Sequence, residues 1–236
     1  MNYSILIPAH NEAENIVDLL MEIERVMTPI SSAWEVVVVD DGSRDQTWDR
    51  LENTQALLPQ LRAIRLKECS GQSAALQAGI AELRGEVTIT LDGDGQNDPK
   101  DIPKLLAFLD SFDVVSGCRV NRQDSWSKRY ISKWANRIRS FLLSDGVSDT
   151  GCSLKAYKTQ YLKRLRLFKG MHRFLPALLI IEGCKVCQVP VSHRPRKHGS
   201  SKYSFFNRGI STVTDLLAVM WMKRRHRHAL IEKRLP

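Results

Sequence analysis

The chain has 236 residues, 43% of them hydrophobic, and a formal net charge of +9. This length and apolar content exclude a disordered chain and suit either one domain with appendages or two small units. The positive charge favours phosphates, an anionic membrane or nucleic acid as partners, without choosing among them. The five cysteines are an odd number scattered along the chain, which indicates a reducing compartment rather than a disulfide framework.

The N-terminal residues lack the basic and apolar regions of a signal peptide. The longest apolar runs, at residues 174–181 and 216–222, are shorter than the roughly 20 residues that a membrane-spanning helix needs. We therefore expect a cytoplasmic protein that is soluble or lies on the cytoplasmic face of a membrane. The isolated CxxC at residues 184–187 lacks the second ligand pair of a zinc site, so we expect buried thiols there.

The first half of the chain alternates strand-like and helix-like segments. Apolar strands are predicted at residues 3–9, 34–41, 61–67, 86–91 and 114–116. Helices are predicted at residues 12–27, 45–58, 70–83 and 99–109. Strands without polar alternation, separated by helices, predict an α/β fold with a mostly parallel, Rossmann-like sheet covered on both faces. Such sheets bind ligands at the carboxyl ends of their strands.

The pattern changes in the second half of the chain. Residues 119–139 hold seven basic residues and one acid, and residues 223–234 hold six basic residues and one acid. Two more strands are predicted at residues 152–157 and 185–193, and a helix is predicted at residues 207–222. We therefore expect a C-terminal extension of the sheet domain, followed by a basic tail.

The sharpest local feature is the sequence DGDGQ at residues 92–96. Asp92, Asp94 and Gln96 are spaced by two, so an extended backbone projects all three side chains to one side. Two carboxylates and an amide oxygen suit Mg²⁺ or Mn²⁺, which neutralises the charge of a departing diphosphate. The alternative is an ordinary Gly-Asp turn. We favour the metal site because two adjacent carboxylates at a strand end repel each other without a cation.

Two further polar clusters follow predicted strands, PAHNE at residues 8–12 and DDGS at residues 40–43. Carboxylates at such positions accept hydrogen bonds from ribose hydroxyls or a base edge. Taken alone, each cluster is better interpreted as an ordinary turn. A dinucleotide site is disfavoured, because no GxGxxG or Walker A motif follows a strand.

Taken together, these three clusters resemble the donor-site motifs of family 2 glycosyltransferases, which have the GT-A fold. Residues 149–157, 172–176, 189–196 and 199–203 resemble motifs of the dolichol- and polyprenyl-phosphate sugar synthases. The resemblance extends from about residue 3 to residue 220. It implies an inverting enzyme that moves a sugar from a GDP- or UDP-sugar to a polyprenyl phosphate.

The resemblance also implies a role for each matching residue. The donor nucleotide would be lined by Pro8, Asn11, Glu12, Asp40 and Asp92. The metal and donor phosphates would be held by Asp92, Asp94 and Gln96. The acceptor phosphate would face Arg119, Arg129 and Ser132. The catalytic residues would be Asp94, Arg119, Arg196 and Lys202. For Arg129 and Ser132, a solvated basic helix is an equally good interpretation.

The resemblance implies a glycosyltransferase domain at residues 1–222. Its nucleotide-sugar half would be residues 1–119, its acceptor half residues 120–222, and a basic tail would follow at residues 223–236. This tail predicts contact with anionic lipid. We also expect either a membrane-protein partner or a homo-oligomer.

The expected chemistry agrees with this inventory of residues. A phosphate monoester has a second pKa of about 6, so it is already largely anionic at neutral pH and needs no general base. The phosphate needs cations to approach the anionic donor, and the guanidinium of arginine suits phosphate.

One alternative to a polyprenyl-phosphate acceptor is a saccharide acceptor, with Asp149 as the base. The other is a basic binding protein without catalysis. The strand-end aspartates oppose nucleic acid as a partner, because they repel phosphates when no metal is bound.

Overall fold

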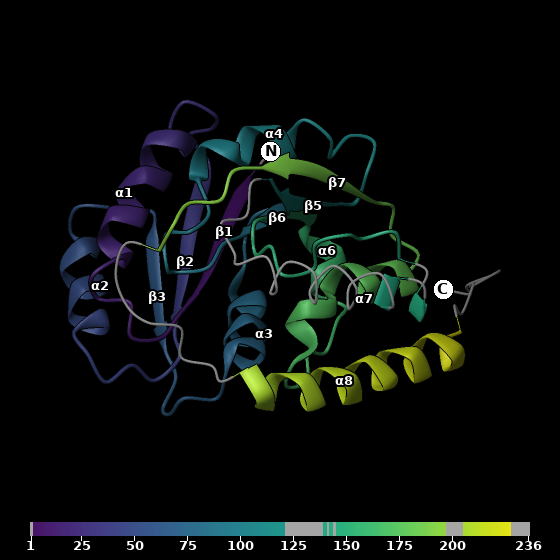
Figure 1. Cartoon of the computed structure of the whole chain (residues 1–236). Helices are drawn as coiled ribbons and strands as arrows, with labels where there is room; N and C mark the ends of the chain where they lie inside the picture. Colours follow the sequence, from purple (N-terminus) through teal and green to yellow (C-terminus); the bar gives the residue numbers. More distant parts are fainter. Residues whose placement is uncertain (1, 121–138, 141, 144, 197–204, 228–236) are drawn as a thin grey trace, which may run out of the picture.

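The computed structural model describes residues 2–120, residues 139–196 apart from 141 and 144, and residues 205–227. Within them, a seven-stranded sheet forms the centre, with helices on both faces (Figure 1). The strands are β1 Tyr3–Ala9, β2 Trp34–Asp40, β3 Leu61–Arg65, β4 Val87–Thr90, β5 Val114–Arg119, β6 Lys155–Lys158 and β7 Val186–Val191. The helices are α1 Ile16–Met27, α2 Thr47–Gln55, α3 Gln72–Glu82, η1 Pro99–Asp101, α4 Ile102–Leu106, α6 Thr159–Leu162, η2 Met171–Phe174, α7 Leu175–Ile181 and α8 Phe205–Arg225.

The strand order is β3-β2-β1-β4-β6-β5-β7. β1 pairs in parallel with β2 and β4, β2 with β3, and β5 with β7. Within this sheet, β6 alone runs against its neighbours β4 and β5. The predicted mostly parallel α/β sheet is therefore confirmed. A strand was predicted at residues 152–157, but the antiparallel direction of β6 was not, because a sequence pattern does not reveal strand direction.

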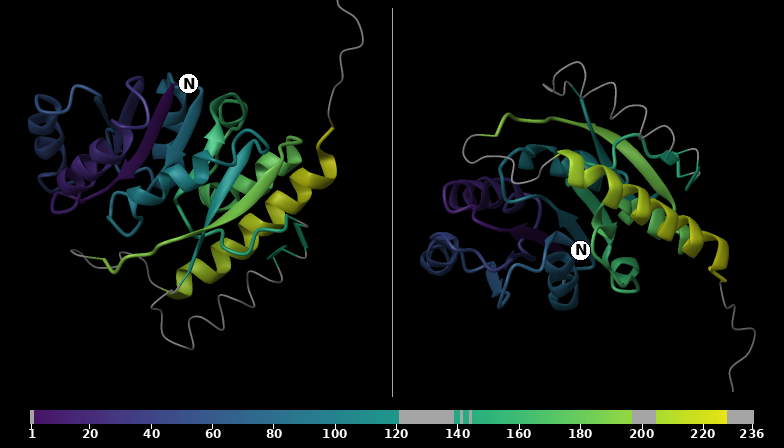
Figure 2. Two further views of the ribbon diagram at one scale, coloured as in Figure 1. Left: turned by 90° about the horizontal axis from the view of Figure 1, so that it is seen from above. Right: turned by 60° about the horizontal axis from the view of Figure 1, so that its bottom comes forward.

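The central strands are buried on both faces, as their apolar runs predict. Ile5 and Ile7 of β1 pack in a hydrophobic cluster with α1, α2 and α4, whereas Leu6 packs in a second cluster with α3, α7 and α8. Gly79 of α3 permits close packing on this second face, since a Cβ at that position would lie 2.3 Å from Leu6 Cδ1. The two views in Figure 2 show α8 along the outside of this helical layer.

Several boundaries differ from the predictions. The helix predicted at residues 99–109 divides into η1 and α4, and the first helix begins at Ile16 rather than at residue 12. α8 continues to Arg225, so the first residues of the predicted basic tail are helical. The elements α6, η2 and α7 were not predicted. Pro176 had interrupted the apolar pattern of α7, although proline is tolerated in the first turn of a helix.

Candidate active site

The polar clusters at residues 8–12, 40–43 and 92–96 meet at one edge of the sheet. β2, β1 and β4 are adjacent and parallel, so their carboxyl ends lie side by side. The Asp41 amide donates to the Ala9 carbonyl at 2.8 Å and joins the ends of β2 and β1. The three clusters, far apart in the sequence, therefore form one site.

Residues 92–96 form a turn rather than the predicted extended segment. Gly95 has a φ of 70°, a left-handed conformation that glycine adopts without a steric penalty. Within the turn, Asp94 Oδ1 accepts a hydrogen bond from the Gln96 amide at 3.1 Å. The extended backbone on which the argument for aligned side chains depends is therefore not formed, because the Gly-Asp turn chemistry prevails.

The turn nevertheless leaves Asp92 and Asp94 electrostatically coupled. Burial raises the pKa of the Asp92 carboxyl to about 6, and the negative charge of Asp94 adds to this rise. A hydrogen bond from Ser153 and the positive charges of Lys155 and Arg119 oppose the rise. Although part of the Asp92 residue is accessible to solvent, its carboxyl is surrounded by protein. Two such carboxylates suit a divalent cation, which favours their ionised form.

The sequence analysis missed two side chains beside Asp92. Gln72, the first residue of α3, donates from Nε2 to Asp92 Oδ1 at 2.7 Å. Lys155 of β6 is buried, and its ammonium group donates to the Cys152 carbonyl. Burial lowers the pKa of Lys155, and nearby negative groups, Asp92 among them, oppose this shift. A lysine within the apolar run 154–157 was the available signal, because charges are rarely buried without partners.

Arg196 contacts the turn directly. Its Nη2 lies 2.6 Å from Asp94 Oδ2; Asp94 is buried, and Arg196 is half-buried. The segment that follows β7 is pinned to the same turn, since the Arg194 amide donates to the Gln96 carbonyl at 2.9 Å. The structure therefore brings Arg196 to the predicted metal ligands. The guanidinium contributes positive charge where two carboxylates converge.

The aspartates of the DDGS cluster have different partners. Asp40 is buried, with Oδ1 accepting from the Ser43 amide at 3.0 Å and Oδ2 lying 3.3 Å from Arg65 Nε. The Asp41 carboxylate accepts from the backbone amides of residues 70 and 71, at 2.7 and 2.8 Å. Asp40 lies at the predicted nucleotide edge, but its carboxylate is already engaged within the protein. Asp41 holds the loop that precedes α3.

The PAHNE cluster is tied to the DDGS cluster through the backbone. Asn11 has a φ of 52°, a left-handed conformation in which asparagine is enriched, and its amide donates to Ser43 Oγ at 2.8 Å. Pro8 is half-buried near the end of β1. The Glu12 carboxylate is close enough to raise the pKa of Arg196, although the hydrogen bond and charge of Asp94 contribute more.

A cleft of about 460 Å³ opens beside this edge of the sheet. It is lined by Gly42, Ser43, Arg44, Arg65, Leu66, Lys67, Glu68 and Cys69. Three basic side chains and one acidic side chain give it a net positive lining, which suits an anionic ligand. Its position next to residues 40–43 places it where the sequence predicts the nucleotide.

Arg119 lies at the end of β5 and forms a buried ion pair with Asp149. Arg119 donates from its backbone amide, Nε and Nη2 to the Asp149 carboxylate, at 3.1, 2.8 and 2.8 Å. The amide of Gly151 donates to the same carboxylate at 3.2 Å. Both Asp149 oxygens are therefore occupied, and this arrangement does not suit a general base. The other predicted acceptor residues, Arg129 and Ser132, and the predicted Lys202, lie outside the described residues.

A mostly parallel sheet with polar and charged side chains gathered at its carboxyl edge is the architecture of α/β proteins that bind ligands at that edge. The family model described as Glycosyl transferase family 2 matches residues 4–166. The chain therefore belongs to this family, and it is a glycosyltransferase.

Two curated relatives match nearly the whole chain. Dodecaprenyl-phosphate galacturonate synthase of Rhizobium johnstonii is 36% identical over 233 residues, which are 95% of this chain and 68% of the relative. Undecaprenyl-phosphate 4-deoxy-4-formamido-L-arabinose transferase of Pseudomonas fluorescens is 37% identical over 219 residues, covering 92% of this chain and 64% of the relative. The chain thus spans about two thirds of the length of these relatives.

Solved structures confirm the predicted GT-A fold. Glucosyl-3-phosphoglycerate synthase from Mycobacterium tuberculosis, in complex with Mn²⁺, UDP and glucosyl-3-phosphoglycerate, aligns with a TM-score of 0.69 at 17% identity, covering 94% of this chain and 79% of that chain. The same enzyme in complex with Mg²⁺ and UDP aligns with a TM-score of 0.68 at 18% identity and the same coverage. At this identity, the likeness shows the fold alone.

Proposed function

We propose that this glycosyltransferase moves a sugar from a GDP- or UDP-sugar to a polyprenyl phosphate, with inversion at the anomeric carbon. The observation that carries the proposal is the pair of carboxylates, Asp92 and Asp94, at the carboxyl edge of the sheet, contacted by Gln72 and Arg196. Both curated relatives carry a polyprenyl phosphate in their names. The site supports the donor side of the reaction, and the relatives support the acceptor side.

Mg²⁺ or Mn²⁺ fits the donor set of Asp92, Asp94 and Gln96. Carboxylate and amide oxygens are the hard ligands that these ions prefer. The raised pKa of Asp92 supports the assignment, since burial and the neighbouring charge of Asp94 disfavour an ionised carboxyl that a bound cation would stabilise. When bound, the metal supplies charge to the leaving diphosphate. Gln72 fixes one oxygen of Asp92 and so orients that carboxylate toward the site.

Arg196 acts as a second cation for the donor diphosphate. It must release Asp94 before that carboxylate can bind a metal, because its guanidinium lies 2.6 Å from Oδ2. It stays near the site after release, since residue 194 remains bonded to residue 96. We assign Arg196 and Lys202 to stabilise the charge that develops on the departing diphosphate.

The acceptor phosphate needs positive charge rather than a base. Its second pKa of about 6 leaves it largely anionic at neutral pH. We retain Arg119, at the end of β5, together with Arg129 and Ser132 as acceptor residues, although Arg119 shares its charge with Asp149. A saccharide acceptor is the weaker candidate, because its hydroxyl needs a base and Asp149 already accepts four N–H groups.

The proposal is tested by measuring donor binding and transfer separately. Calorimetry with a panel of GDP- and UDP-sugars should show binding in Mn²⁺ and its loss in excess chelator. The sugar that binds is then offered with a polyprenyl phosphate and, in parallel, with an oligosaccharide. Transfer to the lipid phosphate supports the proposal, whereas transfer to the oligosaccharide alone contradicts it.

Among the described residues, no helix is long and apolar enough to cross a bilayer. The proposed acceptor nevertheless resides in a membrane. We therefore place the enzyme at the cytoplasmic face of a membrane, where the basic residues 223–236 contact anionic lipids. A membrane-protein partner or a second copy of the chain remains compatible with this placement.

A further inference from the structure

Helix α8 lies on the surface of the molecule with one face against the core (Figure 2). Val219 is buried, and Leu216, Met220 and Met222 pack on the same cluster beneath it. The helix is 21 residues long, which corresponds to about 31 Å. Its inner face is therefore explained by the fold of the protein.

The outer face of α8 is also apolar. Val213, Leu217 and Trp221 follow one another at intervals of four residues, with exposed fractions of 57%, 58% and 64%. Residues at this spacing share one side of a helix. The single acid of α8, Asp215, is partly buried and lies off this line. A row of three large apolar side chains in water differs from the scattered exposed apolar residues of ordinary surfaces.

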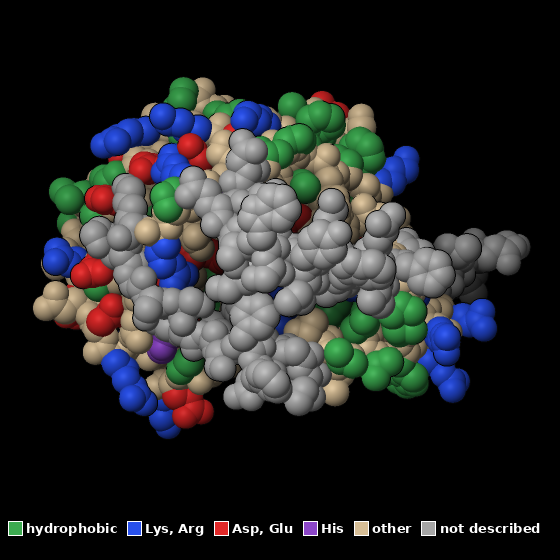
Figure 3. All heavy atoms as spheres, in the orientation of Figure 1, with side chains coloured by type: hydrophobic (Ala, Val, Ile, Leu, Met, Phe, Trp, Pro, Cys, Tyr) green, Lys and Arg blue, Asp and Glu red, His purple; other side chains and the backbone are tan. Residues whose placement is uncertain are grey.

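The apolar row ends at a basic group. Lys223, Arg224 and Arg225 form the last turn of α8 and are exposed. Figure 3 shows apolar side chains gathered at this end of the molecule, with Lys and Arg side chains at their border. An apolar row followed by basic residues matches a membrane interface, where acyl chains lie next to anionic headgroups.

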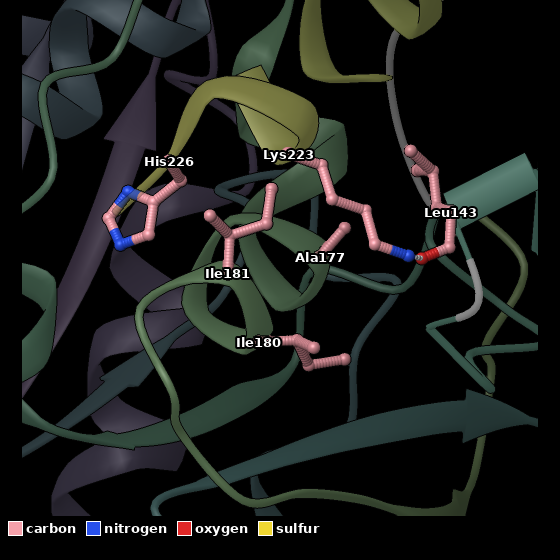
Figure 4. A pocket seen from close by; sticks show the side chains of 6 residues that line it. All are labelled: Leu143, Ala177, Ile180, Ile181, Lys223 and His226. Atoms are coloured by element: carbon pink, nitrogen blue, oxygen red, sulfur yellow. Dashed lines mark hydrogen bonds between the residues drawn. The ribbon is translucent and has the colours of Figure 1, made fainter. Parts of the chain in front are cut away.

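A hollow of about 240 Å³ adjoins the same end of α8 (Figure 4). Its apolar lining is Leu143, Ala177, Ile180 and Ile181, and its basic lining is Lys223 and His226. The Lys223 ammonium reaches across it to the Leu143 carbonyl at 2.5 Å. Apolar and basic side chains are thus adjacent in the hollow, as they are on the outer face of α8.

We propose that the outer face of α8, Val213, Leu217 and Trp221 with Arg224 and Arg225, docks on an anionic lipid bilayer. The helix lies in the plane of the interface, with its apolar row among the upper acyl segments and its last turn among the phosphates. Tryptophan suits this position, because its ring is apolar and its N–H reaches water.

A second copy of the chain is a poorer occupant than a bilayer. A stable interface between proteins uses about 20–30 residues on each side, whereas this row has three large side chains. The inference rests on the proposed function in one respect, namely that a polyprenyl phosphate resides in a membrane. It also assigns membrane contact to the helix, in addition to the basic tail.

The test uses vesicles of phosphatidylcholine with roughly one third phosphatidylglycerol, sedimented with the full chain. Leu217→Asp should weaken binding about tenfold or more, because it places a charge in the apolar interface. Leu57→Asp is the matched control, since Leu57 is an equally apolar residue with an exposed fraction of 75% elsewhere on the surface. It should bind vesicles as the wild type does. Arg224→Ser with Arg225→Ser should lower binding and its salt sensitivity.

Fluorescence gives a second measurement that needs no disruptive variant. Brominated lipids should quench part of the wild-type tryptophan emission, and Trp221→Phe should remove that part. Normal vesicle binding by Leu217→Asp, an equal loss in Leu57→Asp, or no quenching of Trp221 would each overturn the proposal. A change of oligomeric mass in Leu217→Asp with unchanged vesicle binding would instead identify a contact between copies.

Vesicle binding measures docking, whereas donor binding and sugar transfer measure activity, so the two are tested separately. Donor binding, and transfer to a water-soluble short-chain polyprenyl phosphate, should be the same in wild type and Leu217→Asp. If the wild type binds vesicles through α8 but transfers no sugar to either acceptor, the proposed function fails and the docking surface stands. If transfer to the soluble acceptor is normal and no variant affects vesicle binding, the docking surface fails alone.

Discussion

Two pairs of aspartates lie at the same edge of the sheet, and they are held in different ways. Asp41 is bound by backbone amides, and Asp40 by a backbone amide together with Arg65. Among the described residues, Asp92 accepts from the side chains of Gln72 and Ser153, and Asp94 accepts from the Arg196 side chain and from the Gln96 amide of its own turn. A backbone amide cannot leave without unfolding a loop, whereas a side chain can rotate away.

From this difference in hydrogen-bond partners we infer that Asp40 and Asp41 have a structural role, whereas Asp92 and Asp94 have a binding role. Asp40 and Asp41 fix the loops after β2 and β3, which shape the cleft beside residues 42–44. Burial, and then the negative charge of Asp94, disfavour the ionised Asp92 carboxyl and raise its pKa. We therefore propose that a cation from solution binds more readily at the second pair. The following predictions test this contrast.

Substitution of a metal ligand should have the largest effect. Asp94→Asn keeps the size of the side chain but removes its charge, so metal-dependent donor binding should be lost and turnover should fall by roughly 10²–10³-fold. Calorimetry of the donor in Mn²⁺ and a steady-state transfer assay provide the measurement. Unchanged donor affinity in Mn²⁺ would remove Asp94 from the metal site. The unfolding transition should stay close to that of the wild type, because asparagine keeps the size of Asp94 and can still accept the hydrogen bond of the Gln96 amide.

Removal of Arg196 should have effects of opposite sign on metal binding and turnover. Arg196→Ala frees Asp94, so Mn²⁺ should bind severalfold more tightly without donor, while turnover should fall by about 10²-fold. Mn²⁺ titration followed by electron paramagnetic resonance measures the first effect. Arg194→Ala is the matched control, because Arg194 pairs with Glu22 and Asp98 rather than with Asp94. Weaker Mn²⁺ binding in Arg196→Ala would show that Arg196 supports the metal instead of competing with it.

Substitution of Asp41 should affect stability rather than metal binding. Asp41→Ala leaves the amides of residues 70 and 71 without acceptors, which should cost about 2–3 kcal/mol of unfolding free energy. Urea unfolding measures this loss. Mn²⁺ affinity in the folded variant should equal that of the wild type. A large loss of Mn²⁺ affinity without loss of stability would reverse the roles of the two pairs.

The sequence predicted the sheet well, for a physical reason. Strands buried on both faces must be apolar throughout, so runs such as residues 36–39 leave few alternatives. The strand ends could also be predicted, because polar residues follow each run directly. Helix α7 was not predicted, because Pro176 divides its apolar run and proline disfavours a helix interior.

The site was less predictable than the sheet, because its contacts join residues far apart in the chain. Arg119 pairs with Asp149, 30 residues away, and Arg196 pairs with Asp94, 102 residues away. No local pattern encodes such a pair. Gln72 looked like an ordinary helical residue, and only the packing of α3 against β1 and β2 reveals its contact with Asp92.

The pH dependence of stability should show the smallest effect and isolate Asp92. Its pKa is raised from 3.8 to about 6, so the native state binds a proton more tightly than the unfolded state does. Protonated Asp92 therefore adds to the free energy of unfolding at low pH, and this contribution is lost as the pH rises from about 4 to 6. In chelator, Asp92→Asn should be about 1–2 kcal/mol more stable than the wild type at pH 7.5, because asparagine does not ionise.

At pH 4.5 the difference between Asp92→Asn and the wild type should shrink, because the wild-type carboxyl is then mostly protonated. Added Mn²⁺ should stabilise the wild type at pH 7.5 and have little effect on Asp92→Asn, which lacks the charge that binds it. Urea unfolding at both pH values, with and without metal, provides the four comparisons. A variant that is less stable than the wild type at pH 7.5 in chelator would mean that Gln72, Lys155 and Arg119 already compensate Asp92, and that the carboxylate pair does not need a cation from solution.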